Sequence, residues 1–389
     1  MQTITRIFFL LSLISAFFAC RNEPPSNNKV ESVSKAKDLF VVTVSDLRLR
    51  AAPNGQAEVL GQLAEGTVVE GLGETSEKKE EIELRGRLWL EPYHRVMAPG
   101  NKQGWLYGGG LLRVYSGDGK AMPVTEKVEA YAMQLAKLDP KKVASGKTAF
   151  EVAQAGFAGA DAPTSDAGCL LLEHFLRRML FEGDLYNVTD DPKWMDEALM
   201  GAVYENRFDM NTFPETRELA ESGFLLTTAE GSVFPETDYK RLLKAFEGKL
   251  SAAVKACFEQ SAKEMEAPAW ADGGIVLPLT EIVDRAAWWE KFNKENPHFV
   301  QREATRFNES YLILSVTHGG DNTPVTDYEK NEIIPEFREA WRYAQQTYPG
   351  TRTADYCRRM QAVCEKSGWK STPEVEAEMK KISEELLPE

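Results

Sequence analysis

Residues 47–66 read LRLRAAPNGQAEVLGQLAEG, and this stretch decides the fold of the N-terminal part of the chain. Leucines alternate with arginines over 47–50, which is the two-residue period of a strand with one buried face. Residues 52–55 (APNG) supply a turn, and the apolar stretch 59–63 follows as a second short strand. The pattern predicts two short β-strands with a turn between them.

Further strands are expected on both sides of this unit. The candidates are 40–44, 67–70, 89–96 and 104–107. Short strands at this spacing, separated by turns that contain glycine, are typical of a small barrel or sandwich. The charged stretch 74–87 (ETSEKKEEIELRGR) is expected to form an exposed loop or an extended hairpin.

Three separated motifs resemble the bacterial SH3-like domain family. They are LRLRAAP at 47–53, VLGQLAEG at 59–66, and GWLY at 104–107 with Leu111-Leu112 closing the domain. The resemblance implies an SH3-like β-barrel over residues 38–116. It also implies that this domain binds a cell-wall peptide or a protein, since members of the family commonly do so.

Four aromatic residues of this region are candidate ligand-binding groups: Trp89, Tyr93, Trp105 and Tyr107. Flat amphipathic rings bind extended peptides at low entropic cost. Strand alternation favours an inward position for Trp105, and Tyr107 shares its face by parity. Tyr93 follows a proline and is expected to lie exposed in a loop.

The N-terminus differs in composition from the rest of the chain. Arg6 precedes an uncharged, apolar run at 7–18, too short for a transmembrane helix but typical of a signal-peptide core. Ala19-Cys20 closes the run and resembles the bacterial lipobox. The resemblance implies a signal peptide at 1–19 and a lipid on Cys20, which would anchor the protein stably. An ordinary secreted protein cleaved nearby is the alternative.

Residues 20–37 are rich in Pro, Asn, Ser and charge, and they are expected to form a flexible tether. The net charge of −14 argues against nucleic acid as a partner, because nucleic acids require a positive face. Four cysteines remain after Cys20, and they permit two disulfides or four buried thiols. Cys357 and Cys364 lie about two helical turns apart, too far to pair with each other.

After residue 119 the apolar period changes to that of a helix, so residues 119–389 are expected to form a larger α-helical domain. Helices are predicted at 128–138, 170–181, 191–202, 239–257, 279–294, 333–347, 353–367 and 373–386. Residues 311–316 fit either a strand or a buried helix. The word Phe-Pro-Glu-Thr occurs at 213–216 and 234–237, and each copy is expected to start a helix.

His318-Gly319-Gly320-Asp321 is the most site-like stretch of the chain. A histidine and a carboxylate on a glycine loop could form an oriented base, so His318 and Asp321 are weak catalytic candidates. A turn with local hydrogen bonds is the simpler interpretation. The histidines show no metal-ligand spacing, and we expect no cofactor.

The sequence therefore predicts a lipid-anchored protein of the cell envelope that faces the periplasm or the cell surface. Its SH3-like domain would bind a cell-wall (peptidoglycan) peptide or a protein partner, and its helical domain would be an interaction module. The alternative is a cell-wall or surface hydrolase that the SH3-like domain targets.

Overall fold

The computed structural model describes residues 37–183, 185, 214–229 and 232–387. The expected signal peptide, Cys20, nearly all of the expected tether and the helix expected at 191–202 lie outside the described residues. The chain divides into two compact units, one within 29–265 and one over 266–389. Strands give way to helices between 117 and 125, so the first unit holds both the sheet and several helices.

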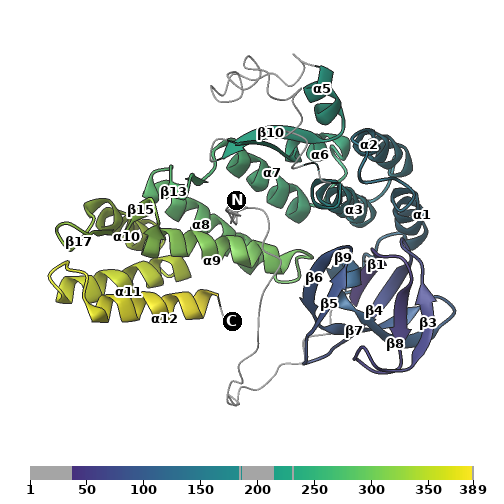
Figure 1. The fold of residues 1–389 in the computed structure, drawn as a ribbon, viewed down its shortest axis with the longest axis horizontal. Helices are drawn as coiled ribbons and strands as arrows, with labels where there is room; N and C mark the ends of the chain where they lie inside the picture. The colour runs from purple at the N-terminus through teal and green to yellow at the C-terminus, as the bar shows by residue number, and fades with distance from the viewer. Residues whose placement is uncertain (1–36, 184, 186–213, 230–231, 388–389) are drawn as a thin grey trace, which may run out of the picture. The chain divides into compact units, whose positions relative to one another are not determined.

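The first unit begins with a seven-stranded antiparallel sheet of order β3-β2-β8-β7-β4-β1-β9 (Figure 1). The strands are β1 (Lys37–Val42), β2 (Leu47–Arg50), β3 (Val59–Leu63), β4 (Val68–Thr75), β7 (Tyr93–Ala98), β8 (Lys102–Tyr107) and β9 (Leu111–Gly117). In the described part of the chain its end strands, β3 and β9, do not pair with each other, so the sheet is open. The expected β region is therefore confirmed as an antiparallel sheet, followed by a mainly helical region.

A separate hairpin, β5 (Glu80–Leu84) and β6 (Arg87–Glu91), occupies the charged stretch. Its turn places Arg85 and Gly86 at φ 53° and 74°. The extended-hairpin alternative is thus confirmed. The prediction of a single strand over 89–96 is wrong. Pro92 separates β6 from β7, because it has no N–H to donate to a ladder of strand hydrogen bonds.

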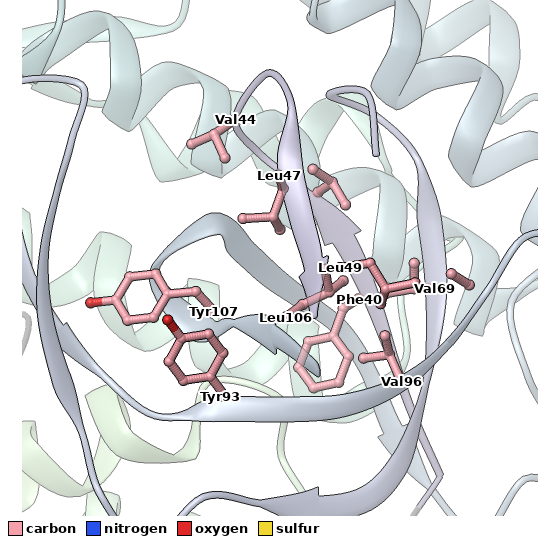
Figure 2. Close-up of a cluster of buried hydrophobic side chains, with 11 residues drawn as sticks. Phe40, Val44, Leu47, Leu49, Val69, Tyr93, Val96, Leu106 and Tyr107 are labelled. Atoms are coloured by element: carbon pink, nitrogen blue, oxygen red, sulfur yellow. The ribbon is translucent and has the colours of Figure 1, made fainter. Parts of the chain in front are cut away.

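Apolar side chains of the strands form the core of the sheet (Figure 2). Leu47 and Leu49 are buried while Arg48 between them is exposed, as the alternation predicts. Phe40, Val96 and Leu106 lie in the same cluster. Burial of such side chains is the main favourable contribution to the folding of this sheet.

The helices of the first unit are α1 (Thr125–Leu135), α2 (Ala144–Gly156), α3 (Ala162–Phe181), α5 (Pro214–Glu221), α6 (Tyr239–Ala245) and α7 (Ala252–Glu266). A hairpin of β10 (Phe224–Ala229) and β11 (Ser232–Thr237) lies among them in the chain. Helix α3 begins at Ala162 rather than at the expected residue 170, because the Asp161 side chain caps it by accepting a hydrogen bond from the Thr164 N–H at 3.0 Å.

Two other expectations for this unit are corrected. The helix expected over 239–257 is two helices, α6 and α7, with Gly248 at φ 71° between them. The second Phe-Pro-Glu-Thr word lies in β11, although the first does start helix α5 at Pro214. Helix α2 was not among the helices predicted from the sequence.

The second unit contains α8 (Leu279–Glu295), α9 (Arg302–His318), α10 (Pro335–Thr347), α11 (Arg352–Lys366) and α12 (Pro373–Leu386). Residues 311–316 lie within α9, which resolves that ambiguity in favour of a helix. The short strands are β12 (Trp270–Ala271), β13 (Gly274–Ile275), β14 (Gly319–Gly320), β15 (Thr323–Pro324), β16 (Thr326–Asp327) and β17 (Glu332–Ile333). None of the described helices is long and apolar enough to cross a membrane.

All four cysteines after Cys20 are buried free thiols. They are Cys169, Cys257, Cys357 and Cys364. The two-disulfide alternative is therefore wrong, and each thiol packs as a small apolar group. Burial raises the pKa of Cys357 to about 12, so this sulfur is not a thiolate at neutral pH.

An ion-pair network links the sheet region to α3. Arg178 Nη1 lies 2.7 Å from Glu65 Oε1, and Arg178 Nε lies 3.1 Å from Glu182 Oε1. Arg85, in the turn of the β5–β6 hairpin, reaches Glu65 at 2.9 Å and Glu182 at 3.1 Å. The two arginines and two carboxylates are each less than a quarter exposed, so they are screened less than surface pairs are.

Two glycines of α2 give a matched test of this packing. A Cβ at Gly146 would lie 2.3 Å from the backbone carbonyl oxygen of Ser222, whereas a Cβ at Gly156 would meet nothing within 4 Å. We expect Gly146→Ala to lower the free energy of unfolding by about 1–3 kcal/mol, because the backbone must move. Gly156→Ala should be neutral or stabilising by up to about 1 kcal/mol. Urea denaturation of both variants checks this, and equal effects would contradict the packing.

Candidate functional site

The structure brings the candidate aromatic residues together beside the β5–β6 hairpin. Tyr93 and Tyr107 lie on the paired strands β7 and β8, with ring centroids 5.4 Å apart and planes at 62°. Figure 2 shows both rings side by side at one end of the core cluster. Trp89 and Trp105 are half-buried and pack against the same cluster.

Tyr93 is only 1% exposed, so the expectation of an exposed loop residue is wrong. Its hydroxyl donates a hydrogen bond to Glu80 Oε2 at 3.1 Å, and the Gly55 N–H donates to the same oxygen at 3.0 Å. Burial, followed by the charge of Glu80, raises the pKa of Tyr93 to about 12. The ring is buried because Tyr93 belongs to the apolar core cluster of the sheet, and Glu80 of β5 accepts the hydrogen bond of its hydroxyl.

Tyr107 is 4% exposed, and its hydroxyl also contacts the hairpin. The oxygen lies 2.5 Å from the carbonyl oxygen of Trp89 and 2.8 Å from that of Glu80, and it accepts a hydrogen bond from the Glu91 N–H at 3.3 Å. Burial is the main cause that raises the pKa of Tyr107 to about 12. Both tyrosines therefore fasten the hairpin to the sheet.

Trp105 is the half-buried aromatic that sequence reasoning placed in the core, and its surroundings are more polar than expected. It lies opposite Arg50 of β2 on one side and opposite Arg95 of β7 on the other. Residues directly opposite each other on neighbouring strands share a face, with Cβ atoms about 5 Å apart. We call Arg50, Trp105 and Arg95 the arginine–tryptophan row.

The two arginines of this row are held by the protein. Arg50 donates to the carbonyl oxygen of Ala57 at 2.8 Å, and Arg95 lies 2.9 Å from Glu74 Oε1. Sequence reasoning noted the alternating arginines of β2 but did not predict that they meet a tryptophan. Strand pairing brings them together, and the order of strands across a sheet leaves no local signal in the sequence.

A second polar cluster lies along α3. Glu173 is buried, its Oε1 lies 3.6 Å from Arg177 Nη1, and it accepts a hydrogen bond from Tyr239. Burial raises the pKa of Glu173, against the opposing charge of Arg177. Burial likewise raises the pKa of Glu236 on β11 from 4.5 to about 7. The Cys257 thiol faces the same cluster, and burial raises its pKa too.

This cluster could not be predicted as a unit from the sequence. Its members come from α3, β11, α6 and α7, and abundant carboxylates elsewhere conceal them. Buried groups with altered pKa values mark candidate functional sites, but buried structural ion pairs alter pKa values in the same way. The contacts of Glu173 with Arg177 and Tyr239 are those that a buried carboxyl group needs in a protein interior.

A small cavity lies among β1, α1 and α3, and His174 is one of its lining residues. Burial, followed by the charge of Arg178, lowers the pKa of His174 to about 3. Its Nε2 has no hydrogen-bond partner among the described residues. The ring is therefore neutral at neutral pH and packs between the sheet and α3.

His318 ends helix α9 and is engaged by its neighbours. Its Nε2 lies 2.8 Å from the carbonyl oxygen of Met379, to which it donates, and its Nδ1 lies 2.8 Å from Thr317 Oγ1. Asp321 lies exposed in the turn between β14 and β15. Among the described residues, no hydrogen bond or ion pair joins Asp321 to His318. Burial lowers the pKa of His318, which favours the neutral ring.

No group of three or more His, Cys, Asp or Glu side chains that could hold a metal ion occurs within the described residues. Comparison with protein-family models, with curated proteins and with solved structures finds no match for this chain.

The burial of Tyr93 predicts the effect of two substitutions. Tyr93→Ala should lower the free energy of unfolding by about 3–5 kcal/mol, because it empties the aromatic core. Tyr93→Phe should cost about 1–2 kcal/mol, because Glu80 loses a donor. Urea denaturation checks both, with Tyr328→Phe, at an 80% exposed position, as the neutral control. An unchanged free energy of unfolding in Tyr93→Ala would contradict the burial of Tyr93.

Glu236 predicts a pH dependence of stability. Its folded pKa of about 7 exceeds the ordinary value of 4.5, so the folded state holds the proton more tightly. The stability that this proton supplies is complete below pH 4.5 and is lost as the pH rises through 7. Relative to Glu236→Gln, the wild-type chain should therefore lose roughly 1–3 kcal/mol between pH 5 and pH 8. If the free energy of unfolding changes equally in the two chains between pH 5 and pH 8, the assignment to Glu236 is contradicted.

Proposed function

We propose that this chain is a lipid-anchored protein of the bacterial cell envelope, and that its N-terminal sheet is an SH3-like domain that binds a cell-wall peptide or a protein. The anchor rests on the apolar run that closes at Ala19-Cys20. After cleavage, Cys20 would be the first residue and would carry the lipid. The folded units would then lie outside the cytoplasm, at the periplasmic face or the cell surface.

The positions of the three SH3-like motifs support the domain assignment. The first lies on β2 and the turn after it, the second on β3 and its following turn, and the third on β8, with Leu111-Leu112 at the start of β9. Strands β3, β2 and β8 are consecutive neighbours in the sheet. Motifs that are separate in sequence are therefore adjacent in space, as a common domain architecture requires.

The observation that carries the binding function is the arginine–tryptophan row. Trp105 is partly exposed and lies directly opposite an arginine on each neighbouring strand, so this face offers a flat apolar ring together with donors for carboxylate and carbonyl oxygens. Trp and Arg are enriched at the residues that dominate binding energies in interfaces. The surface that fits a peptide is thus Trp105 with its flanking arginines, in place of the buried Tyr93.

The hydrolase alternative named His318 and Asp321 as its catalytic pair. Both ring nitrogens of His318 lie 2.8 Å from protein oxygens, and Asp321 points to solvent in a separate turn. A general base needs a free nitrogen within reach of its substrate. These contacts favour a binding module over the hydrolase.

The anchor has a direct test. In cells, Cys20→Ser should move the protein from the membrane fraction to the soluble fraction, because no lipid can be attached. Metabolic labelling with a fatty acid should mark the wild-type chain only. Unchanged membrane retention of Cys20→Ser would refute the lipid anchor.

The binding function is tested on the non-lipidated chain with purified peptidoglycan and, separately, with envelope extract. Saturable binding to either should fall at least tenfold in the double variant Arg50→Gln, Arg95→Gln. The matched control is Arg342→Gln, an exposed arginine of α10. Binding that survives the double variant would remove the row from the proposed surface.

A further inference from the structure

The two end strands of the sheet are protected differently. Strand β9 packs against α3 and carries Arg113. Strand β3 has only β2 as a hydrogen-bonded neighbour in the described part of the chain. One edge of β3 therefore presents backbone N–H and C=O groups that can pair with another strand.

The sequence of β3 lacks two of the features that usually protect an edge, although the strand is short and its register with β2 shifts between Leu49 and Arg50. Its five residues, VLGQL, include no charge and no proline. Val59 and Leu60, which are adjacent in the chain, are 44% and 41% exposed. Natural edge strands are commonly blocked by Lys, Pro or a covering element, because an exposed apolar edge pairs with other chains. In the described part of the chain, this edge is unpaired and two apolar side chains beside it are exposed.

The side chains beside the edge indicate which kind of strand fits. Arg48 of β2 lies directly opposite Gln62 of β3, and both are exposed. No ion pair of Arg48 occurs within the described residues. A strand added at β3 would lie two strand spacings from β2, about 10 Å, which a long arginine and a glutamate can bridge between them. An acidic residue on the added strand would therefore be attracted to Arg48.

We propose that the edge of β3 receives an extended segment of a partner protein as an eighth strand, with apolar residues beside Val59 and Leu60 and an acidic residue facing Arg48. The proposal rests on the binding function proposed above and specifies the partner as a protein segment instead of a wall peptide. Backbone hydrogen bonds would supply affinity, and the alternating side chains would supply specificity. Arg50 lies on β2 and Trp105 on β8, the next two strands after β3 in the sheet, so both residues would extend the same contact surface.

The test uses the full chain from residue 20, non-lipidated through Cys20→Ser, and a display library of random nine-residue L-peptides. We expect the selected peptides to alternate apolar residues and to carry Asp or Glu. Leu60→Lys should weaken their binding at least tenfold, because it places a charge on the edge. Arg48→Glu should turn the preference toward Lys and Arg.

Leu88→Lys is the matched control, since Leu88 is a 63% exposed leucine on β6 of the separate hairpin. It should leave peptide binding unchanged. Circular dichroism and urea midpoints would show that all three variants keep the fold, so that a loss of binding is not a loss of structure.

Five outcomes would overturn the proposal. The first is a selection that enriches no peptides. The second is a set of enriched peptides whose binding neither Leu60→Lys nor Arg48→Glu alters. Retention on purified peptidoglycan that Leu60→Lys abolishes would make the occupant a wall polymer. A dimer in sedimentation that Leu60→Lys dissociates would make it a second copy of this chain. Peptide binding lost in Arg50→Gln, Arg95→Gln but kept in Leu60→Lys would refute the edge and leave the proposed function standing.

Discussion

The ion pair between Arg178 of α3 and Glu65, in the turn after β3, is the interaction on which the first unit depends. Glu65 and Arg178 are 113 residues apart in the chain, yet they meet at 2.7 Å with little exposure to solvent. Arg85 and Glu182 complete a network in which each carboxylate meets two cations. Removing one partner from such a network leaves an uncompensated charge, which costs far more than a surface pair contributes. The sheet and the helices before residue 265 are therefore expected to fold as one unit.

The packing of α3 and of the β5–β6 hairpin on the sheet also determines which surfaces of the sheet can bind a partner. Helix α3 packs on β9 at one end of the sheet, and the β5–β6 hairpin binds the hydroxyls of Tyr93 and Tyr107. At the other end of the sheet, β3 pairs with β2 alone in the described part of the chain, and the arginine–tryptophan row lies on neighbouring strands. The proposed binding function and the proposed partner strand use these remaining surfaces. The same helix holds Glu173 within the interior, so α3 carries much of the buried charge of the unit.

Local patterns in the sequence predicted the elements well and the contacts between them poorly. The alternation in 47–50 and the apolar stretch 59–63 predicted β2 and β3, and the helix predicted at 373–386 is α12. Tyr93 was misplaced because parity and a preceding proline say nothing of a hairpin that folds back over the strand. Asp161 followed by Ala162-Pro163 is a helix-start signal, and it lies well before the start predicted for α3 at residue 170. Arg50 beside Trp105, and Glu65 beside Arg178, depend on strand order and on helix packing, which no short window encodes.

The most direct test of the single-unit account is native-state hydrogen exchange on the wild-type chain and on Arg178→Leu, which keeps much of the side-chain volume. In the wild type, the slowest amides of β1 and of α3 should share one opening free energy, because sheet and helices unfold together. In Arg178→Leu both sets should lose protection by the same amount. If the amides of β1 keep their protection while those of α3 lose it, the sheet is an independent domain and the account is wrong.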